Sequence, residues 1–566
     1  MTEVFELADR IVEATAAADP IASTFMGVAG YAMRLTDYSS EADDARTDQV
    51  RSWLTELESL PVTNDDDRLA AACLRERLGV RVSLHATGEN LRDCNVLGSM
   101  VQAPRNVFTL MPTATEQDWD TIATRLEAVP ECLESVRSAY ATGIERGQVA
   151  ARRQVAGTAE VAALCAGTGP SGGPAPWFAT YVEQYDGADT TLQRRLQAGA
   201  HGATQAYAGL ARWMQDSYVP ASDPDDAVGA ERFGRRARAF TGADLDLADT
   251  YAWGWADLAR ITTRMNECAA RLYGGTTPAS AQAQLDIDPA HTIEGAQATL
   301  DWLQQLTDET IESFDGRYFD IPDAMRRCEA MSAPPGSAAA PFYTPPSEDF
   351  SRPGRTWLPT YGEDRFRSWW LTSVWYHEAV PGHHLQFGYS MLQRDRLSRF
   401  QRTEFISGHV EGWALYAERL MDELGYFEDP ATELGYLSAQ AMRAARIVLD
   451  IGLHLGLAIP SDVDPALLDG VSGDPRGVTW NRELAREFLA ARSLQPDAFA
   501  ASEVDRYLGM PGQAISYKVG ERVWLAARED ARGAEGPAFD LKAWHMRALA
   551  LGSVGLDVLR TELAHR

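Results

Sequence analysis

The feature that most constrains the fold of this chain is the helical spacing of its apolar residues. In residues 46–60, 66–80 and 116–146, apolar side chains recur every three or four positions, with polar side chains between them. This period places the apolar side chains on one face of an α-helix. Pro130 interrupts the third segment and predicts a kink or a break there. The same pattern predicts further helices over 188–216, 243–273, 292–314, 365–380, 383–395, 404–425, 430–457, 480–495, 514–530 and 540–550.

Strand signals are few. Short β-like pieces occur within 95–111 and 352–361, and neither supports a large sheet. We therefore predict a mostly α, multi-helix fold with little β.

A proline-rich segment divides the helical pattern. Because the chain has 566 residues, more than one compact core usually holds, we expect two or more lobes. Residues 333–348 read APPGSAAAPFYTPPSE, a composition typical of extended or turn-rich backbone. We place an N-terminal helical region at 1–332 and a catalytic helical region at 333–566. The segment is either a linker or a loop over the active site that carries Phe342 and Tyr343.

The charge balance excludes some classes of partner. The chain has 81 acidic and 52 basic residues, a net charge of -29. Nucleic acids and anionic membrane surfaces bind clustered Lys and Arg, so we expect neither as a partner. The first residues, MTEVFELADR, have acids where a signal peptide has bases, and the six cysteines show no CxxC spacing. We expect a cytoplasmic protein with reduced thiols.

The segment WYHEAVPGHHLQ, from Trp375 to Gln386, carries the strongest chemical signal. The zinc-protease signature H-E-x-x-H places two histidines one helical turn apart, with a glutamate beside them as a base. Here His377 and Glu378 match the first half, but Pro381 occupies the position of the second histidine.

A straight helix cannot bring a later histidine to the same metal, because residues seven apart are separated by about 10.5 Å along the axis. Pro381 and Gly382 make a straight helix improbable, so we predict a bulge that lets a later histidine reach the metal. We prefer His383, since Gln386 then falls three residues further along the resumed helix, and keep His384 as the alternative.

A third ligand is expected from the segment HVEGWALYAERL at 409–420. Glu411 and Glu418 are seven residues apart and share one face of a helix whose other residues are largely apolar. A buried acid needs a partner, and a metal is a suitable one for Glu411. Glu418 would then hold a ligating imidazole from outside the metal shell.

These motifs mark a resemblance. The segments HEAVPGHHLQ, EGWALYAE, EVDRYLGMPGQAISYKVGE and WHMRALALGSVGLDVL resemble the bacterial family known as domain of unknown function 885. That family is similar to zinc peptidases of the glutamate-ligand zincin (gluzincin) type, and the two-residue expansion of H-E-x-x-H is part of its pattern. The resemblance implies a two-lobed, zincin-like peptidase with a deep central cleft, one side of which is formed by residues 1–332.

The residue types suggest a role for each candidate. Zn²⁺ held by His377, His383 and Glu411 would keep one position open for water, and Glu378 would act as general base. The oxyanion needs a further donor, for which Tyr517 is the first candidate and His545 the second.

Further polar residues remain open. Arg506 and Tyr507 are other candidate donors by residue type. Arg446, Asp450 and His454 are spaced four apart and form either a buried polar ladder or a substrate contact.

We therefore expect a zinc-dependent hydrolase, a metallopeptidase that cleaves short peptides. A zinc-dependent amidase or esterase on a non-peptide substrate is an alternative, because water activation is the same in both. A non-catalytic helical metal-binding protein is a third reading, against which Glu378 beside His377 argues. The one G-x-S-x-G match, at residues 169–173, lies in a segment that is a loop by composition and not between a strand and a helix, which disfavours covalent catalysis.

Overall fold

The computed structural model describes residues 2–169, 174–274, 276–333, 340–347, 350–360 and 362–565. The chain forms two compact units. Unit 1 comprises residues 1–67, 74–228 and 505–510, and unit 2 comprises residues 68–73, 229–504 and 511–566. The expected division at residue 332 is therefore corrected to residue 228. The reason is that α13 (Leu247–Tyr273) packs along α20 (Pro430–Leu455), which joins residues 229–332 to the histidine-bearing half.

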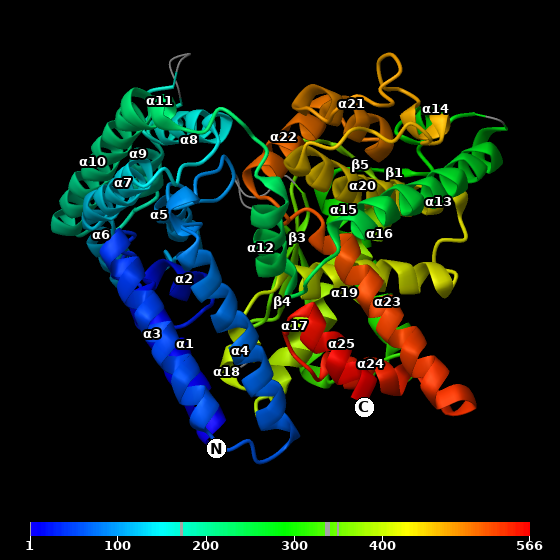
Figure 1. The fold of residues 1–566 in the computed structure, drawn as a ribbon, viewed down its shortest axis with the longest axis horizontal. Helices are drawn as coiled ribbons and strands as arrows, with labels where there is room; N and C mark the ends of the chain where they lie inside the picture. Colours follow the sequence, from blue (N-terminus) through cyan, green and yellow to red (C-terminus); the bar gives the residue numbers. More distant parts are fainter. Residues whose placement is uncertain are drawn as a thin grey trace. The chain divides into compact units, whose positions relative to one another are not determined.

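Unit 1 is helical in its described residues, and its long helices α1, α3 and α4 are the blue elements of Figure 1. Its helices are α1 (Glu3–Ala18), α2 (Pro20–Phe25), α3 (Ser40–Ser59), α4 (Asp65–Ala86, of which residues 68–73 belong to unit 2), α5 (Ala103–Asn106), α6 (Glu116–Glu127), α7 (Val129–Glu145), α8 (Arg152–Cys165), α9 (Trp177–Val182), α10 (Thr190–Trp213) and α11 (Val219–Ala221). The expected break at Pro130 separates α6 from α7. Residues 103–110, expected as β-like, form helical turns instead.

The core of unit 1 surrounds α10, which packs against α6, α7, α8 and α9. Several of its aromatic side chains meet edge to face, as Phe108 does with Phe178 at a ring separation of 5.7 Å. Edge-to-face contact is a preferred arrangement of aromatic rings in a protein interior.

Unit 2 holds the remaining helices: α12 (Gly229–Thr241), α13, α14 (Pro278–Leu285), α15 (Ala296–Phe314), α16 (Ser368–Glu378), α17 (His383–Leu392), α18 (Arg399–Thr403), α19 (Ser407–Glu423), α20, α21 (Arg482–Ser493), α22 (Asp497–Gly509, whose last residues belong to unit 1), α23 (Ser516–Glu535), α24 (Leu541–Leu549) and α25 (Leu556–His565). Its centre is α20, which contacts α13, α16 and α21. Asp429 caps its first turn, and Gly456, with φ of 62°, ends it.

The helices α19 and α23 touch backbone to backbone. A Cβ on Gly412 would lie 2.5 Å from the Cα of Gly520, and a Cβ on Gly520 would lie 2.1 Å from the carbonyl oxygen of Gly408. Glycine at these positions is what permits so close an approach.

The strands form two small sheets in unit 2. Strand β1 (Thr292–Glu294) pairs antiparallel with β5 (Arg365–Arg367). Strand β4 (Gly354–Leu358) lies between β2 (Cys328–Ser332), which is parallel to it, and β3 (Phe342–Thr344), which is antiparallel. The mostly α fold with little β is thus confirmed, and β4 confirms the strand expected within 352–361.

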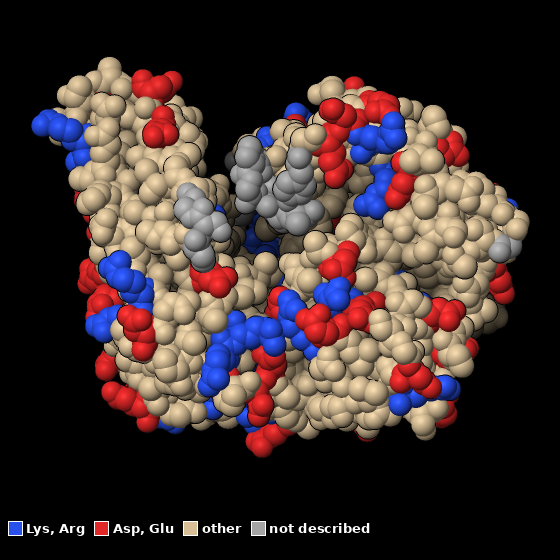
Figure 2. Space-filling view, turned by 90° about the horizontal axis from the view of Figure 1, so that it is seen from above, with Lys and Arg blue, Asp and Glu red and all other residues tan. Residues whose placement is uncertain are grey.

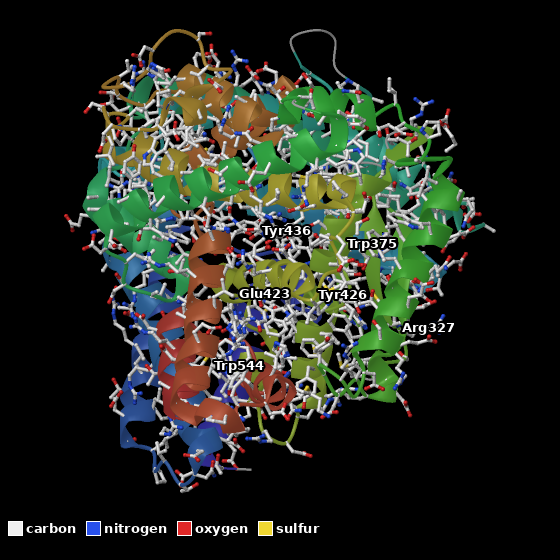
Figure 3. All side chains as sticks on the ribbon, turned by 90° about the vertical axis from the view of Figure 1, so that its right-hand side faces the viewer. Arg327, Trp375, Glu423, Tyr426, Tyr436 and Trp544 are labelled. Atoms are coloured by element: carbon white, nitrogen blue, oxygen red, sulfur yellow. The ribbon has the colours of Figure 1, made fainter. Side chains whose placement is uncertain are left out.

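In unit 2, many large aromatic side chains are buried and many charged side chains are exposed, as expected of a folded protein. Trp375 and Tyr436 are 1% and 2% exposed, whereas the Arg327 side chain is 72% exposed (Figure 3). On the face shown in Figure 2, acidic and basic side chains are interspersed. Among the described residues, none of the helices is both long enough and apolar enough to span a bilayer.

Candidate metal centre

The histidine segment is two helices joined by a tight turn. Helix α16 ends at Glu378 and α17 begins at His383, with a cis peptide bond between Val380 and Pro381. The N–H of Gly382 donates to the Tyr376 carbonyl at 3.1 Å, six residues back. The expected bulge within one helix is therefore corrected to a complete helix break. Pro381 lacks the N–H that a continuing helix needs.

Helix α19 holds this turn in place. The indole N–H of Trp413 lies 3.0 Å from the Pro381 carbonyl oxygen and 3.2 Å from that of Gly382. Trp413 is fully buried, and it follows Glu411 by two residues on the same helix. One helix thus supplies a candidate ligand and fixes the start of the helix that supplies another.

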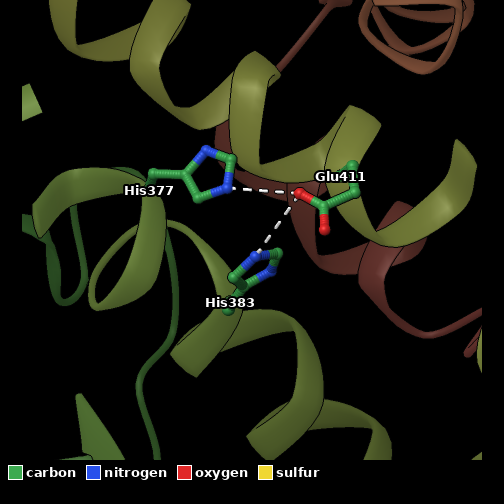
Figure 4. A group of neighbouring side chains, drawn as sticks. All are labelled: His377, His383 and Glu411. Atoms are coloured by element: carbon green, nitrogen blue, oxygen red, sulfur yellow. Dashed lines mark ion pairs between the residues drawn. The ribbon is translucent and has the colours of Figure 1, made fainter. Parts of the chain in front are cut away.

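The three expected ligands lie together (Figure 4). Glu411 Oε2 is 3.3 Å from His377 Nε2 and 3.8 Å from His383 Nε2. One ligand atom from each residue lies within 4.8 Å of the others. Ligands about 2.1 Å from a tetrahedral zinc are separated by about 3.4 Å, so these spacings suit such an ion.

The chemistry of the group also fits a cation. Glu411 Oε2 is buried and has no hydrogen-bond partner among the described residues. A buried carboxylate oxygen without a donor is costly unless a cation faces it. Two imidazoles and a carboxylate form a donor set that suits zinc.

Glu378 lies beside the group. Its Oε2 is 4.0 Å from His383 Nε2, and the residue is 8% exposed. Burial raises the pKa of Glu378 to about 8, and the neighbouring Glu411 carboxylate adds to this effect. A carboxyl group whose pKa lies near neutrality can both accept and return a proton.

The charges of the ligands shift one another's pKa. Burial lowers the pKa of His377, but the Glu411 and Glu418 carboxylates outweigh it and raise the pKa to about 9. Burial and the positive His377 lower the pKa of His383 to about 3. Burial opposes ionisation of Glu411, yet His377 and His383 bring its pKa to about 2.

Glu418 holds His377 from the side away from Glu411. Its Oε1 is 2.8 Å from His377 Nδ1, and its other oxygen accepts a hydrogen bond from Ser373 at 2.9 Å. Glu418 thus lies against His377 in the position expected of it, which stays a prediction of its role. With the Nδ1 proton directed at Glu418, the Nε2 atom of His377 faces the group.

Arg443 is a member of the site that the sequence did not single out. Its Nη2 lies 3.3 Å from Glu418 Oε1 and 3.4 Å from His377 Nδ1. It is 6% exposed and stands on α20. The sequence does contain a signal for Arg443, which is a cation in a long apolar helix, three residues before Arg446. Such a charge needs a buried counter-ion, and this requirement could have indicated a buried acidic partner.

Comparison with known proteins now defines the family. Residues 20–563 match the model of a family described as "Bacterial protein of unknown function (DUF885)". The chain belongs to the DUF885 family. Curated protein sequences give no match to it.

Solved structures share the fold of this DUF885 protein. A "putative lipoprotein" from Colwellia psychrerythraea superimposes with a TM-score of 0.83 at 22% identity, over 100% of this chain and 98% of the other. A "putative lipoprotein of unknown function" from Shewanella oneidensis gives 0.73 at 16% identity, over 99% of both chains. At these identities the likeness concerns the fold.

In the DUF885 protein, His384 faces away from the group. Its Nδ1 lies 2.9 Å from the Tyr343 hydroxyl, and its Nε2 lies 2.8 Å from the Met325 carbonyl oxygen. Both ring nitrogens are engaged, so of the two alternatives the geometry favours His383. Tyr343 belongs to β3, so this part of the proline-rich segment is built into unit 2, while residues 334–339 and 348–349 lie outside the described residues.

Tyr517 is linked to the group through Arg443. It is the second residue of α23 and is half-buried. The Arg446 and Arg443 guanidinium carbons lie 4.7 and 6.0 Å from its ring centre. Tyr517 remains the candidate donor by residue type.

His545 is corrected to a structural residue. It is fully buried, with Nε2 at 2.7 Å from the Tyr416 hydroxyl and Nδ1 at 3.0 Å from the Tyr318 carbonyl oxygen. It stacks on Phe319 at 4.5 Å. Neither nitrogen is available to an oxyanion, so residue type alone was misleading here. Tyr507 is likewise fully buried.

The row on α20 is a buried polar ladder. Arg446 pairs with Glu503 at 2.7 Å, and His454 Nε2 lies 3.7 Å from Asp450. Asp450 also accepts the N–H of Gly512 at 3.1 Å. These contacts support the ladder over a substrate contact.

Proposed function

We propose that this DUF885 protein is a zinc-dependent hydrolase, a metallopeptidase that cleaves short peptides. The observation that carries the proposal is the convergence of His377 Nε2, His383 Nε2 and Glu411 Oε2, with the Glu378 carboxyl group beside them. A purely structural metal site is usually closed by four protein ligands and needs no adjacent base.

His377, His383 and Glu411 would hold the ion. When bound, zinc supplies a Lewis acid that lowers the pKa of water to about 7 and polarises a substrate carbonyl. Arg443 and Glu418 keep His377 oriented for this task, since both contact its Nδ1 edge.

Glu378 moves the proton. Its carboxylate accepts a proton from the attacking water and returns it to the leaving nitrogen, which a peptide requires before it can depart. The Tyr517 hydroxyl donates a hydrogen bond to the oxyanion that develops on the attacked carbonyl.

Peptide as the substrate class, the two-lobed zincin-like architecture and the central cleft are part of this proposal and rest on the resemblance to gluzincins. A cytoplasmic location is also proposed, and it is supported by the six cysteines, all of which are free thiols. The lipoprotein description of the two structural neighbours points the other way.

Metal analysis tests the first half of the proposal. The protein purified with zinc in the buffer is expected to hold about one equivalent, as three converging protein ligands imply. Retention of no transition metal would refute it.

Substitution of the base tests the second half. Glu378→Gln is expected to keep the metal and lose peptide hydrolysis by a factor of about 10²–10⁴. Undiminished hydrolysis by this variant would show that Glu378 is not the base. A peptide library and an ester panel, followed by mass spectrometry, distinguish a peptidase from an esterase.

A further inference from the structure

The aromatic side chain of Phe387 lies next to His383 of the candidate metal centre. His383 and Phe387 are one helical turn apart on α17, so they share a face. Their ring centres are 6.0 Å apart. Phe387 is half-buried, and it therefore forms part of the apolar wall next to a proposed ligand.

Phe405 packs against Phe387 and lies at the surface. It lies between α18 and α19, and its ring stacks on Phe387 at 6.4 Å with an interplanar angle of 9°. It is 58% exposed. Leaving a large apolar side chain in water forgoes the burial energy that it would otherwise contribute.

Tyr343 also packs against Phe387. The two rings stack at 6.1 Å with an interplanar angle of 20°. The Tyr343 hydroxyl is engaged by His384, which fixes the ring in place. Tyr343, Phe387 and Phe405 thus form an aromatic strip that runs from beside His383 to an exposed end.

We infer that the aromatic strip, through Phe405 and Phe387, binds a bulky apolar side chain of the peptide substrate next to the bond that is cut. The strip offers ring faces, and its one hydroxyl group is already bonded, so it gains most by burying an apolar or aromatic side chain. Its contact with His383 places that side chain beside the group proposed to carry the reaction.

This inference rests on the proposed function and sets its substrate class. Peptides with Phe, Tyr, Trp, Leu or Met at one position flanking the cut are preferred over those with Ala, Gly or a charged residue there.

Phe405→Ala tests the strip. Two matched peptides differ only in having Phe or Ala at a position flanking the cut. For the wild type, kcat/KM of the Phe peptide is divided by kcat/KM of the Ala peptide. We expect the variant to lower this ratio about ten-fold, the scale of discrimination that apolar pockets reach. Phe405→Leu, which keeps an apolar side chain, should give an intermediate ratio. Phe25→Ala is the matched control, because Phe25 is 54% exposed and lies outside the strip; it should leave the ratio unchanged.

A binding measurement separates this inference from the proposed function. Isothermal titration calorimetry of zinc-loaded Glu378→Gln, with and without Phe405→Ala, uses Ala-Phe-Ala and Ala-Ala-Ala as probes. If Ala-Phe-Ala binds more tightly than Ala-Ala-Ala and Phe405→Ala removes the difference, the aromatic strip binds the apolar side chain. This conclusion holds even if the wild type hydrolyses no peptide. Absence of hydrolysis would contradict the proposed peptidase activity and leave the strip unaffected. An unchanged kcat/KM ratio in Phe405→Ala, or equal binding of both probes to the Glu378→Gln protein, overturns the inference.

Discussion

Gly382→Ala is the sharpest test of how the helix break builds the candidate centre. A Cβ at this position would lie 1.9 Å from the His377 carbonyl oxygen and 2.6 Å from that of Tyr376. Both are backbone atoms, so they cannot turn aside as a flexible side chain would. The end of α16 and the start of α17 would have to separate by about 1.1 Å to restore even the 3.0 Å that Cβ contacts rarely breach.

Two losses follow from this separation. Overpacking costs about 1–3 kcal/mol, and weakening the hydrogen bonds made by Gly382 N–H and by Trp413 costs about 1 kcal/mol each. We therefore expect the free energy of unfolding to fall by about 3–5 kcal/mol. Metal sites tolerate about 0.2 Å in ligand distance, so a shift several times larger should weaken zinc binding at least about a hundred-fold.

The assay pairs urea unfolding with zinc competition against a chromophoric chelator. Gly533→Ala is the matched control, because Gly533 is an exposed position within α23 where an added Cβ meets nothing within 4 Å. It should stabilise the protein by about 0.5–1 kcal/mol and leave zinc binding unchanged. Wild-type stability and zinc affinity in Gly382→Ala would refute the account of the turn.

Other predictions concern the surroundings of the group. Glu418→Gln should weaken zinc binding about 10–100-fold in the same competition assay, because His377 loses the carboxylate that orients it, and an unaltered affinity would contradict that role. Arg443→Met should alter the visible spectrum of the cobalt-loaded protein while Arg443→Lys restores it in part, since Arg443 acts through Glu418; identical spectra would show that it does not. Burial lowers the pKa of His545 to about 3. The unfolded chain takes up this proton near pH 6.5, so stability should fall below about pH 6.5 by up to about 1.4 kcal/mol per pH unit. Urea unfolding at about pH 7 and about pH 5 should show a smaller loss in His545→Gln, and an equal loss would contradict the assignment.

The helices and the convergence of His377, His383 and Glu411 could be predicted because they depend on local patterns. Apolar periodicity and caps fix elements such as α20, and the spacing of Glu411 and Glu418 on one helix indicates that both can face the same histidine. The helix break, by contrast, is fixed by Trp413 from a distant part of the chain. A sequence shows that Pro381 disrupts a helix without showing what stabilises the disruption.

The remaining errors share one cause, which is tertiary contact. The unit boundary depends on the packing of α13 along α20, which no change of composition near residue 228 announces. His545 was a candidate by residue type, and its partners Tyr416 and Tyr318 come from elsewhere in the chain. Arg443 was missed because its counter-ion is distant in sequence.

The contact between Gly412 and Gly520 has a mechanical consequence. At this crossing the backbones of α19 and α23 meet, so no side chain lies between the two helices there that could yield. Glu411, next to Gly412, and Tyr517, one turn before Gly520, are therefore carried by one stiff block. A motion that widens the space around a substrate must take place elsewhere, and the distance between these two residues stays constant while it does.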